Sequence, residues 1–146
     1  MRKLIKLFLV IIFFSCSSNS NSEFELCSGD KRPYYYPALE YKGGFYKVKK
    51  YFFDNYKSSK KINYSGIVKI RFDVNCKGET GNFIMSNYTL DYKDTVVDGE
   101  FTEQLLYLTK SLRDWVPAHE QGKPINSYKF FAFKLMKGKL IDILPK

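Results

Sequence analysis

Histidine and cysteine are scarce in this chain of 146 residues, which contains one His and three Cys. A zinc site needs several such ligands at set spacings, and His119 lies at no finger-like spacing from either Cys27 or Cys76. Glycine-rich phosphate loops and His/Glu metal motifs are also missing, and His119 forms no recognisable nucleophile–base pair with Glu120 or with the aspartates. The sequence therefore predicts no catalytic residue, metal, cofactor or enzymatic activity, and an exposed loop position for His119.

Long hydrophobic runs are likewise missing. The apolar run at residues 7–14 is too short for a membrane anchor, which needs about 20 residues. Basic residues precede the run and Ser15 and Cys16 end it, which is typical of an export signal. We therefore expect residues 1–15 to be a signal peptide.

The end of this signal, Phe13-Phe14-Ser15-Cys16, resembles the lipobox of bacterial lipoproteins. The resemblance implies that Cys16 becomes the first mature residue and carries the lipid, with palmitate among the expected acyl groups. It also implies a lipid-anchored protein of the bacterial cell envelope whose domain lies in the periplasm, without deciding between the inner and the outer membrane. The alternative is an ordinary cleaved signal with an incidental cysteine.

Positive charge is in excess, with 24 Lys plus Arg against 15 Asp plus Glu and a net charge of +9. Loss of the three basic residues in the signal leaves +9 − 3 = +6. An exported protein does not meet nucleic acid, so we expect no nucleic-acid partner despite this charge. The hydrophobic fraction of 45% and the 13 Phe, 12 Tyr and one Trp can form the core of one domain.

Residues 16–29 begin with Cys16 and a stretch rich in Ser and Asn, so we expect the lipidated Cys followed by a flexible tether. A single domain is expected over residues 30–146. With Cys16 assigned to the lipid, Cys27 and Cys76 remain in a chain expected in an oxidising compartment. The sequence predicts a disulfide between them. The alternative is two free buried thiols.

Periodicity predicts the secondary structure of this domain. Apolar residues recur every three or four positions from Gly44 to Lys57 and from Asp98 to Trp115, which indicates two amphipathic helices. Alternation predicts a strand at residues 68–74, and the turn residues at 75–78 predict that residues 80–88 return antiparallel to it. A long aromatic strand is expected at residues 125–135 and a further short strand at residues 140–144. The expected fold class is α+β, with a small antiparallel sheet of about three strands packed against two helices, in the order helix-strand-strand-helix-strand.

Residues 34 to 146 resemble the C-terminal domain of TonB-like proteins. The similarity lies in Trp115-Val116-Pro117-Ala118 after a helix, then Gly122-Lys123-Pro124-Ile125, and in the earlier segments Gly66-Ile67-Val68 and Phe72-Asp73-Val74-Asn75. It implies about three antiparallel strands with two helices on one face. The chain lacks the uncleaved membrane helix and the long Pro-rich spacer of the TonB energy transducers, so we expect a stand-alone relative of that domain and not the transducer.

Family members bind an extended segment of an outer-membrane transporter by adding it as a strand at a sheet edge. The resemblance places this peptide-binding edge at residues 140–144. Its members are Leu140, Ile141, Asp142, Ile143 and Leu144. The expected partner is thus an envelope protein or peptide segment, with a TonB-dependent-type transporter as one candidate, and an open edge also permits a strand-exchanged homodimer.

A second hypothesis is a structural envelope lipoprotein without a peptide groove. Its basic, aromatic surface would bind an anionic polymer or membrane. The candidate basic patch consists of Lys47, Lys49, Lys50, Lys60 and Lys61. This hypothesis requires these lysines to converge on one surface, which the sequence alone does not decide.

Overall fold

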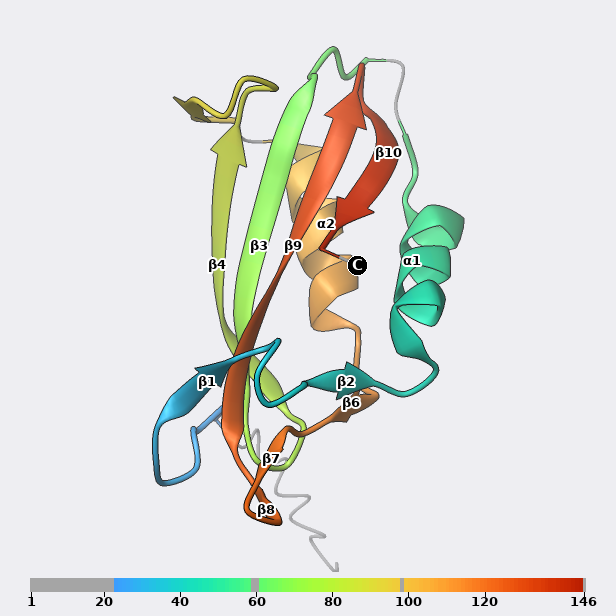
Figure 1. The fold of residues 1–146 in the computed structure, drawn as a ribbon. Helices are drawn as coiled ribbons and strands as arrows, with labels where there is room; N and C mark the ends of the chain where they lie inside the picture. Colours follow the sequence, from blue (N-terminus) through green and yellow to red (C-terminus); the bar gives the residue numbers. More distant parts are fainter. Residues whose placement is uncertain (1–22, 59–60, 98, 146) are drawn as a thin grey trace, which may run out of the picture.

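The structure is a computed structural model that describes residues 23–58, 61–97 and 99–145. A twisted six-stranded sheet forms its centre, in the order β1-β9-β3-β4-β5, with β10 pairing with β9 on the same side as β1 (Figure 1). The three long strands are β3 (Gly66–Val74), β4 (Thr80–Tyr88) and β9 (Asn126–Met136), all paired antiparallel. The shorter members are β1 (Lys31–Pro33), β5 (Asp94–Thr95) and β10 (Lys139–Leu144).

The prediction of an α+β domain with a small antiparallel sheet is wrong. The chain is mostly β, with 42% of its residues in strands, and its large sheet is mixed because β1 runs parallel to β9. Two further ribbons consist of β2 (Glu40–Tyr41) with β6 (Trp115–Val116), and of β7 (His119–Glu120) with β8 (Lys123–Pro124). These extra strands are two or three residues long, too short for alternation to show, so the predicted order of elements omitted them.

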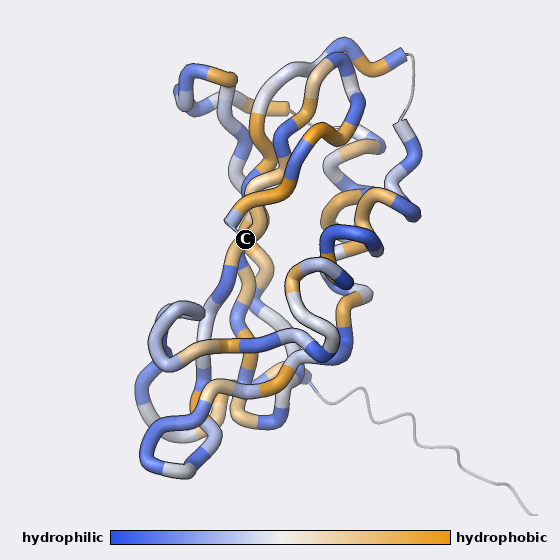
Figure 2. The backbone as a smooth tube through the Cα atoms, turned by 45° about the vertical axis from the view of Figure 1, so that its right-hand side comes forward, coloured by the Kyte–Doolittle hydropathy of each residue, from blue (hydrophilic) through white to orange (hydrophobic). Residues whose placement is uncertain are grey.

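Two helices pack on one face of the sheet in the described part of the chain, namely α1 (Gly44–Asn55) and α2 (Glu100–Lys110) (Figures 1 and 2). The first follows Gly43, whose φ of 95° suits glycine. The second ends at Lys110, five residues before the predicted end at Trp115. Trp115 is nevertheless buried, because it lies in β6 and its ring packs against Phe72 and Phe131 of the large sheet.

Aromatic rings form the centre of the core between the helices and the sheet. Phe131 on β9 is fully buried, with its ring centroid 5.6 Å from that of Phe52 on α1, 5.6 Å from that of Phe72 on β3 and 6.2 Å from that of Trp115. The inward positions of β9 alternate as the sequence predicts. Buried aromatic residues thus fill the centre of the core, whereas other aromatic residues, such as Tyr35 and Tyr46, are exposed.

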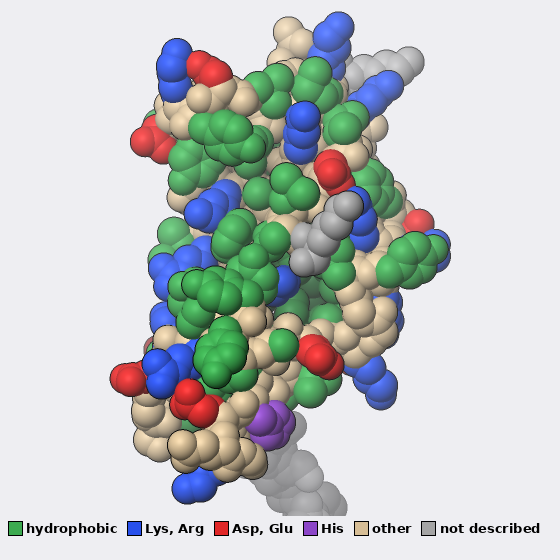
Figure 3. All heavy atoms as spheres, viewed as in Figure 1, with side chains coloured by type: hydrophobic (Ala, Val, Ile, Leu, Met, Phe, Trp, Pro, Cys, Tyr) green, Lys and Arg blue, Asp and Glu red, His purple; other side chains and the backbone are tan. Residues whose placement is uncertain are grey.

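The opposite face of the sheet is turned away from both helices and carries basic and hydrophobic side chains intermixed (Figure 3). Lys69 lies over the ring of Phe130, with Nζ 4.6 Å from the ring centroid. Arg71 lies over Tyr128 in the same way, at 4.5 Å. Cation–π contacts therefore cover apolar rings that would otherwise face water.

The predicted disulfide is confirmed. Cys27 and Cys76 are bonded, with their Cα atoms 6.0 Å apart. Around it, the Cys27 N–H donates to Oδ1 of Asn126 at 2.9 Å, and the Asn126 amide donates to the Cys27 carbonyl at 2.7 Å. The described part of the predicted tether is thus fixed against the start of β9. No helix in the described ranges is long and apolar enough to cross a membrane.

Candidate functional site

The predicted binding edge forms the strand β10, which lies at the border of the sheet. On one side it pairs with β9, and on the other side it has no strand partner among the described residues. A register shift between Leu140 and Asp142 leaves Ile141 without a partner residue on β9. Ile141 is exposed, whereas Ile143 is fully buried, so Ile143 anchors the strand in the core.

Helix α1 lies near this edge. Lys49 on the helix forms an ion pair with Asp142 on β10, with 2.5 Å between Nζ and Oδ1. A hollow of about 180 Å³ lies between the end of α1 and the start of β10. It is lined by Phe53, Tyr56, Ser58, Lys139 and Leu140.

A second partly open edge, which the sequence analysis missed, belongs to β4. Strand β5 pairs with β4 at Asn87 and Tyr88 alone, which leaves residues 82–86 of β4 without a paired strand on that side in the described structure. At the other end of β4, the ring of Phe24 lies so close to Gly81 that a Cβ there would clash with it. The open stretch is thus bounded at both ends.

The lysines of the predicted basic patch pair with carboxylates on different elements. Lys47 forms an ion pair with Asp114 at 3.0 Å and Lys50 with Asp54 at 2.7 Å, and these hydrogen bonds raise the pKa of both lysines. Lys49 contacts β10, as described above. Lys61 is exposed in the turn before β3. The charges on α1 are therefore largely neutralised locally. Lys60 and the predicted lipidation site Cys16 lie outside the described residues.

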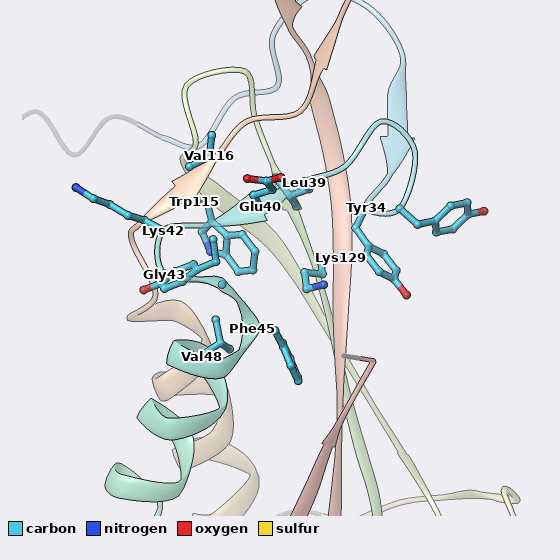
Figure 4. A pocket seen from close by; sticks show the side chains of 13 residues that line it. Tyr34, Leu39, Glu40, Lys42, Gly43, Phe45, Val48, Trp115, Val116 and Lys129 are labelled. Carbon is cyan, nitrogen blue, oxygen red and sulfur yellow. The ribbon is translucent and has the colours of Figure 1, made fainter.

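A larger cavity than the hollow between α1 and β10 lies at the other end of α1. It has a volume of about 600 Å³ and is lined by residues of β2, β6, β9, the start of α1 and the loop after β1. Figure 4 shows Lys129 between Tyr34 on one side and Trp115 on the other, with Phe45 and Val48 of α1 below them. Tyr41 also lines the cavity, its ring in edge contact with Trp115 at 5.0 Å between centroids.

Lys129 is the unusual residue of this cavity. Its side chain follows the inward positions of β9 and only 6% of the residue is exposed, yet it has no hydrogen bond or ion pair within the described ranges. Its Nζ lies 4.1 Å from the ring centroid of Tyr34 and 5.7 Å from that of Phe131. Burial lowers the pKa of Lys129 to about 8, because the cavity walls remove water from the ammonium group.

The sheet border is interrupted beside Lys129. Strand β1 pairs with residues 126–128 of β9 and strand β10 with residues 132–136, so residues 129–131 have no strand on that side. The sequence analysis missed this lysine as a site residue. The available signal was its place in the alternation Ser127, Lys129, Phe131, Phe133, where a cation occupies a position that points into the core.

No protein-family model, curated protein or solved structure matches this chain. Its similarity to the TonB C-terminal domain therefore stays a prediction based on motifs. No group of three or more His, Cys, Asp or Glu side chains in the described ranges is placed to hold a metal ion. His119 is exposed on β7, with Nδ1 2.9 Å from the carbonyl oxygen of Pro117.

Proposed function

We propose that this protein is a lipid-anchored binding module of the bacterial cell envelope that captures an extended peptide or protein segment by strand addition at β10. The observation that carries this proposal is the outer edge of β10, which has no strand partner although its inner edge is paired with β9. Backbone groups at such an edge supply hydrogen bonds to any extended chain. Affinity would thus come from the backbone and selectivity from nearby side-chain hollows.

Two features favour β10 over the open stretch of β4. The hollow between α1 and β10 offers space for a side chain of an added segment, with Phe53 and Tyr56 as apolar walls. The ion pair of Lys49 and Asp142 gives polar contacts at the same border. By contrast, β4 is bounded by β5 and by Phe24, which leaves little room for a strand to continue past either end.

The similarity to TonB C-terminal domains supports the same mode of binding and suggests a TonB-dependent-type outer-membrane transporter as a partner. A second copy of this chain, in a strand-exchanged homodimer, is another candidate occupant of the edge. The alternative of a basic surface for anionic polymer or membrane has less support, because the α1 lysines pair with Asp114, Asp142 and Asp54. Binding through exposed charge would fall steeply with salt. Strand addition would depend on salt weakly.

Proline at Ile141 tests the proposal. A decapeptide selected from a random library for binding to the purified protein serves as the probe. Because Ile141 has no partner residue on β9, Ile141→Pro should remove a backbone N–H of β10 with little loss of pairing inside the sheet. We expect affinity for the decapeptide to fall at least about tenfold, while Ile141→Ala, which keeps the N–H, stays within about threefold. Isothermal titration calorimetry measures both, and circular dichroism verifies that both variants are folded.

Amide hydrogen exchange on the unmodified protein provides a second measurement that does not depend on a variant folding. The bound decapeptide should slow exchange at residues 139–144. Protection confined to β4, or equal affinity of the folded Ile141→Pro variant, would show that β10 is not the binding edge.

A further inference from the structure

A buried cation without an anionic partner is the starting observation. An ammonium group removed from water is unfavourable unless a carboxylate or several acceptors replace the lost hydration. Lys129 is almost fully buried, and in the described structure it has aromatic neighbours but no carboxylate within ion-pairing distance. Its side chain lines the cavity shown in Figure 4, so a molecule entering there would meet the charge directly.

The N-terminus of α1 lines the same cavity. Gly43 is its N-cap and supplies no side-chain hydrogen bond, and the first turn contains no acidic residue. The first N–H groups of a helix lack partners within it and carry the positive end of the helix dipole. Gly43, Gly44 and Phe45 are all lining residues, so an uncapped helix start and an unpaired ammonium group border one space. Both favour a bound anion.

Most of the remaining walls are apolar or aromatic, and Glu40 and Lys42 are the other charged lining residues. Leu39, Tyr41, Val48 and Trp115 line the interior, and Tyr34 closes the side next to Lys129. A volume of about 600 Å³ is in the range of small-molecule sites. The cavity therefore offers one positively charged region and a larger apolar region.

We propose that this cavity binds a small organic carboxylate, with its carboxylate group next to Lys129 and the start of α1 and its apolar or aromatic body between Tyr41, Phe45 and Trp115. A carboxylate fits better than a phosphate group, because no arginine lines the cavity to bind a dianion with paired hydrogen bonds. This inference goes beyond the proposed capture of a peptide at β10. It involves a different set of residues.

Fluorescence provides the measurement, because Trp115 is the single tryptophan of the chain and lines the cavity. The purified protein is titrated with 3-phenylpropionate, with decanoate, with the neutral 3-phenylpropionamide and with inorganic phosphate. We expect both carboxylates to bind at least about tenfold more tightly than the amide and than phosphate, since only the carboxylates combine one negative charge with an apolar body.

Lys129→Met tests the charge while keeping a similar side-chain length. This variant should bind 3-phenylpropionate at least about tenfold more weakly and bind the amide within about twofold of the unmodified protein. The matched control is Lys69→Met, which removes a lysine that also lies over an aromatic ring, but on the opposite face of the sheet. The control should leave both affinities unchanged.

The pH dependence gives an independent readout. Binding of the carboxylate should weaken as the pH rises past about 8, where Lys129 loses its proton, whereas binding of the amide should not. The other titratable groups lining the cavity are Tyr34, Tyr35, Glu40, Tyr41 and Lys42, and burial raises the pKa of Tyr41. Lys129→Met should remove this pH dependence.

Equal binding of carboxylate and amide by the unmodified protein would overturn the inference, as would phosphate binding as tightly as the carboxylates. An unchanged carboxylate affinity in Lys129→Met would also overturn it. These outcomes are distinct from those at β10, because Ile141 does not line this cavity. Each proposal can therefore fail while the other holds.

Discussion

Replacing both Cys27 and Cys76 by alanine lowers the free energy of unfolding by about 4 kcal/mol. The two residues are 49 positions apart, and opening a loop of this size restores chain entropy to the unfolded state of about that magnitude. The bond also holds the segment before β1 against the turn between β3 and β4. Without the disulfide, the segment around residue 27 is held to β9 only by weaker contacts, such as the hydrogen bonds between its backbone and the Asn126 side chain.

Urea denaturation of the double variant and of the unmodified protein measures this loss. Cys16→Ala is the matched control, since it removes a cysteine outside the bonded pair and should leave the free energy of unfolding unchanged. A loss smaller than about 1 kcal/mol in the double variant would mean that tertiary packing alone holds the first strand in place.

Lys129→Met raises the free energy of unfolding at pH 7 by about 2 kcal/mol. Burial lowers the pKa of Lys129 from 10.5 to about 8, and a difference of this size corresponds to about 3 kcal/mol at most. We reduce the figure because the ammonium group borders a solvent-accessible cavity. Methionine fills a similar volume next to Tyr34 and Phe131 without a charge to desolvate.

The pH dependence of this effect follows from the direction of the shift. Between pH 8 and 10.5 the unfolded chain keeps a proton on Lys129 that the folded chain has released, so the stability of the unmodified protein rises with pH across this window. Below pH 8 both states are protonated and the full cost of burial is present. The advantage of Lys129→Met should therefore be largest at pH 7 and shrink towards pH 10.

Denaturation of Lys129→Met, of Lys69→Met and of the unmodified protein at pH 7 and pH 10 tests this prediction. Lys69 lies on the outer face of the sheet, so its variant should show no such pH-dependent gain. If Lys129→Met is less stable than the unmodified protein at pH 7, the ammonium group is better solvated in the cavity than its burial indicates.

The two lysine experiments are linked. Residues of binding sites often reduce the stability of the fold, because the site is optimised for binding and not for folding. The carboxylate that pairs with Lys129 would offset the cost of burial, so 3-phenylpropionate should raise the stability of the unmodified protein and leave that of Lys129→Met almost unchanged.

The sequence predicted those elements whose pattern is long enough to be recognised. Strands β3 and β9 are nine and eleven residues long, and their alternation indicated where they lie, while the turn after β3 indicated that β4 returns antiparallel. The same argument gave α1 and the start of α2. It overestimated α2, because Leu112 and Trp115 continue its helical spacing but are buried by the loop and by β6.

Part of the candidate binding edge was predictable as well. Residues 140–144 were expected to form a short strand, and the resemblance to the TonB C-terminal domain placed the binding edge there. The bulge at Ile141 and the neighbouring hollow were not predictable, since they depend on how β10 pairs with β9 and on where α1 ends.

By itself the sequence determined the long strands, the two helices and the availability of two cysteines for a disulfide, because periodicity and composition are local properties. Only the tertiary structure decided the mixed six-stranded sheet, since β1 pairs with a part of β9 that lies about a hundred residues away in the chain. It also decided the site at Lys129. A lysine among inward positions becomes an unpaired buried cation only when β1 and β10 leave a gap between them and α1 brings its uncapped start to that gap.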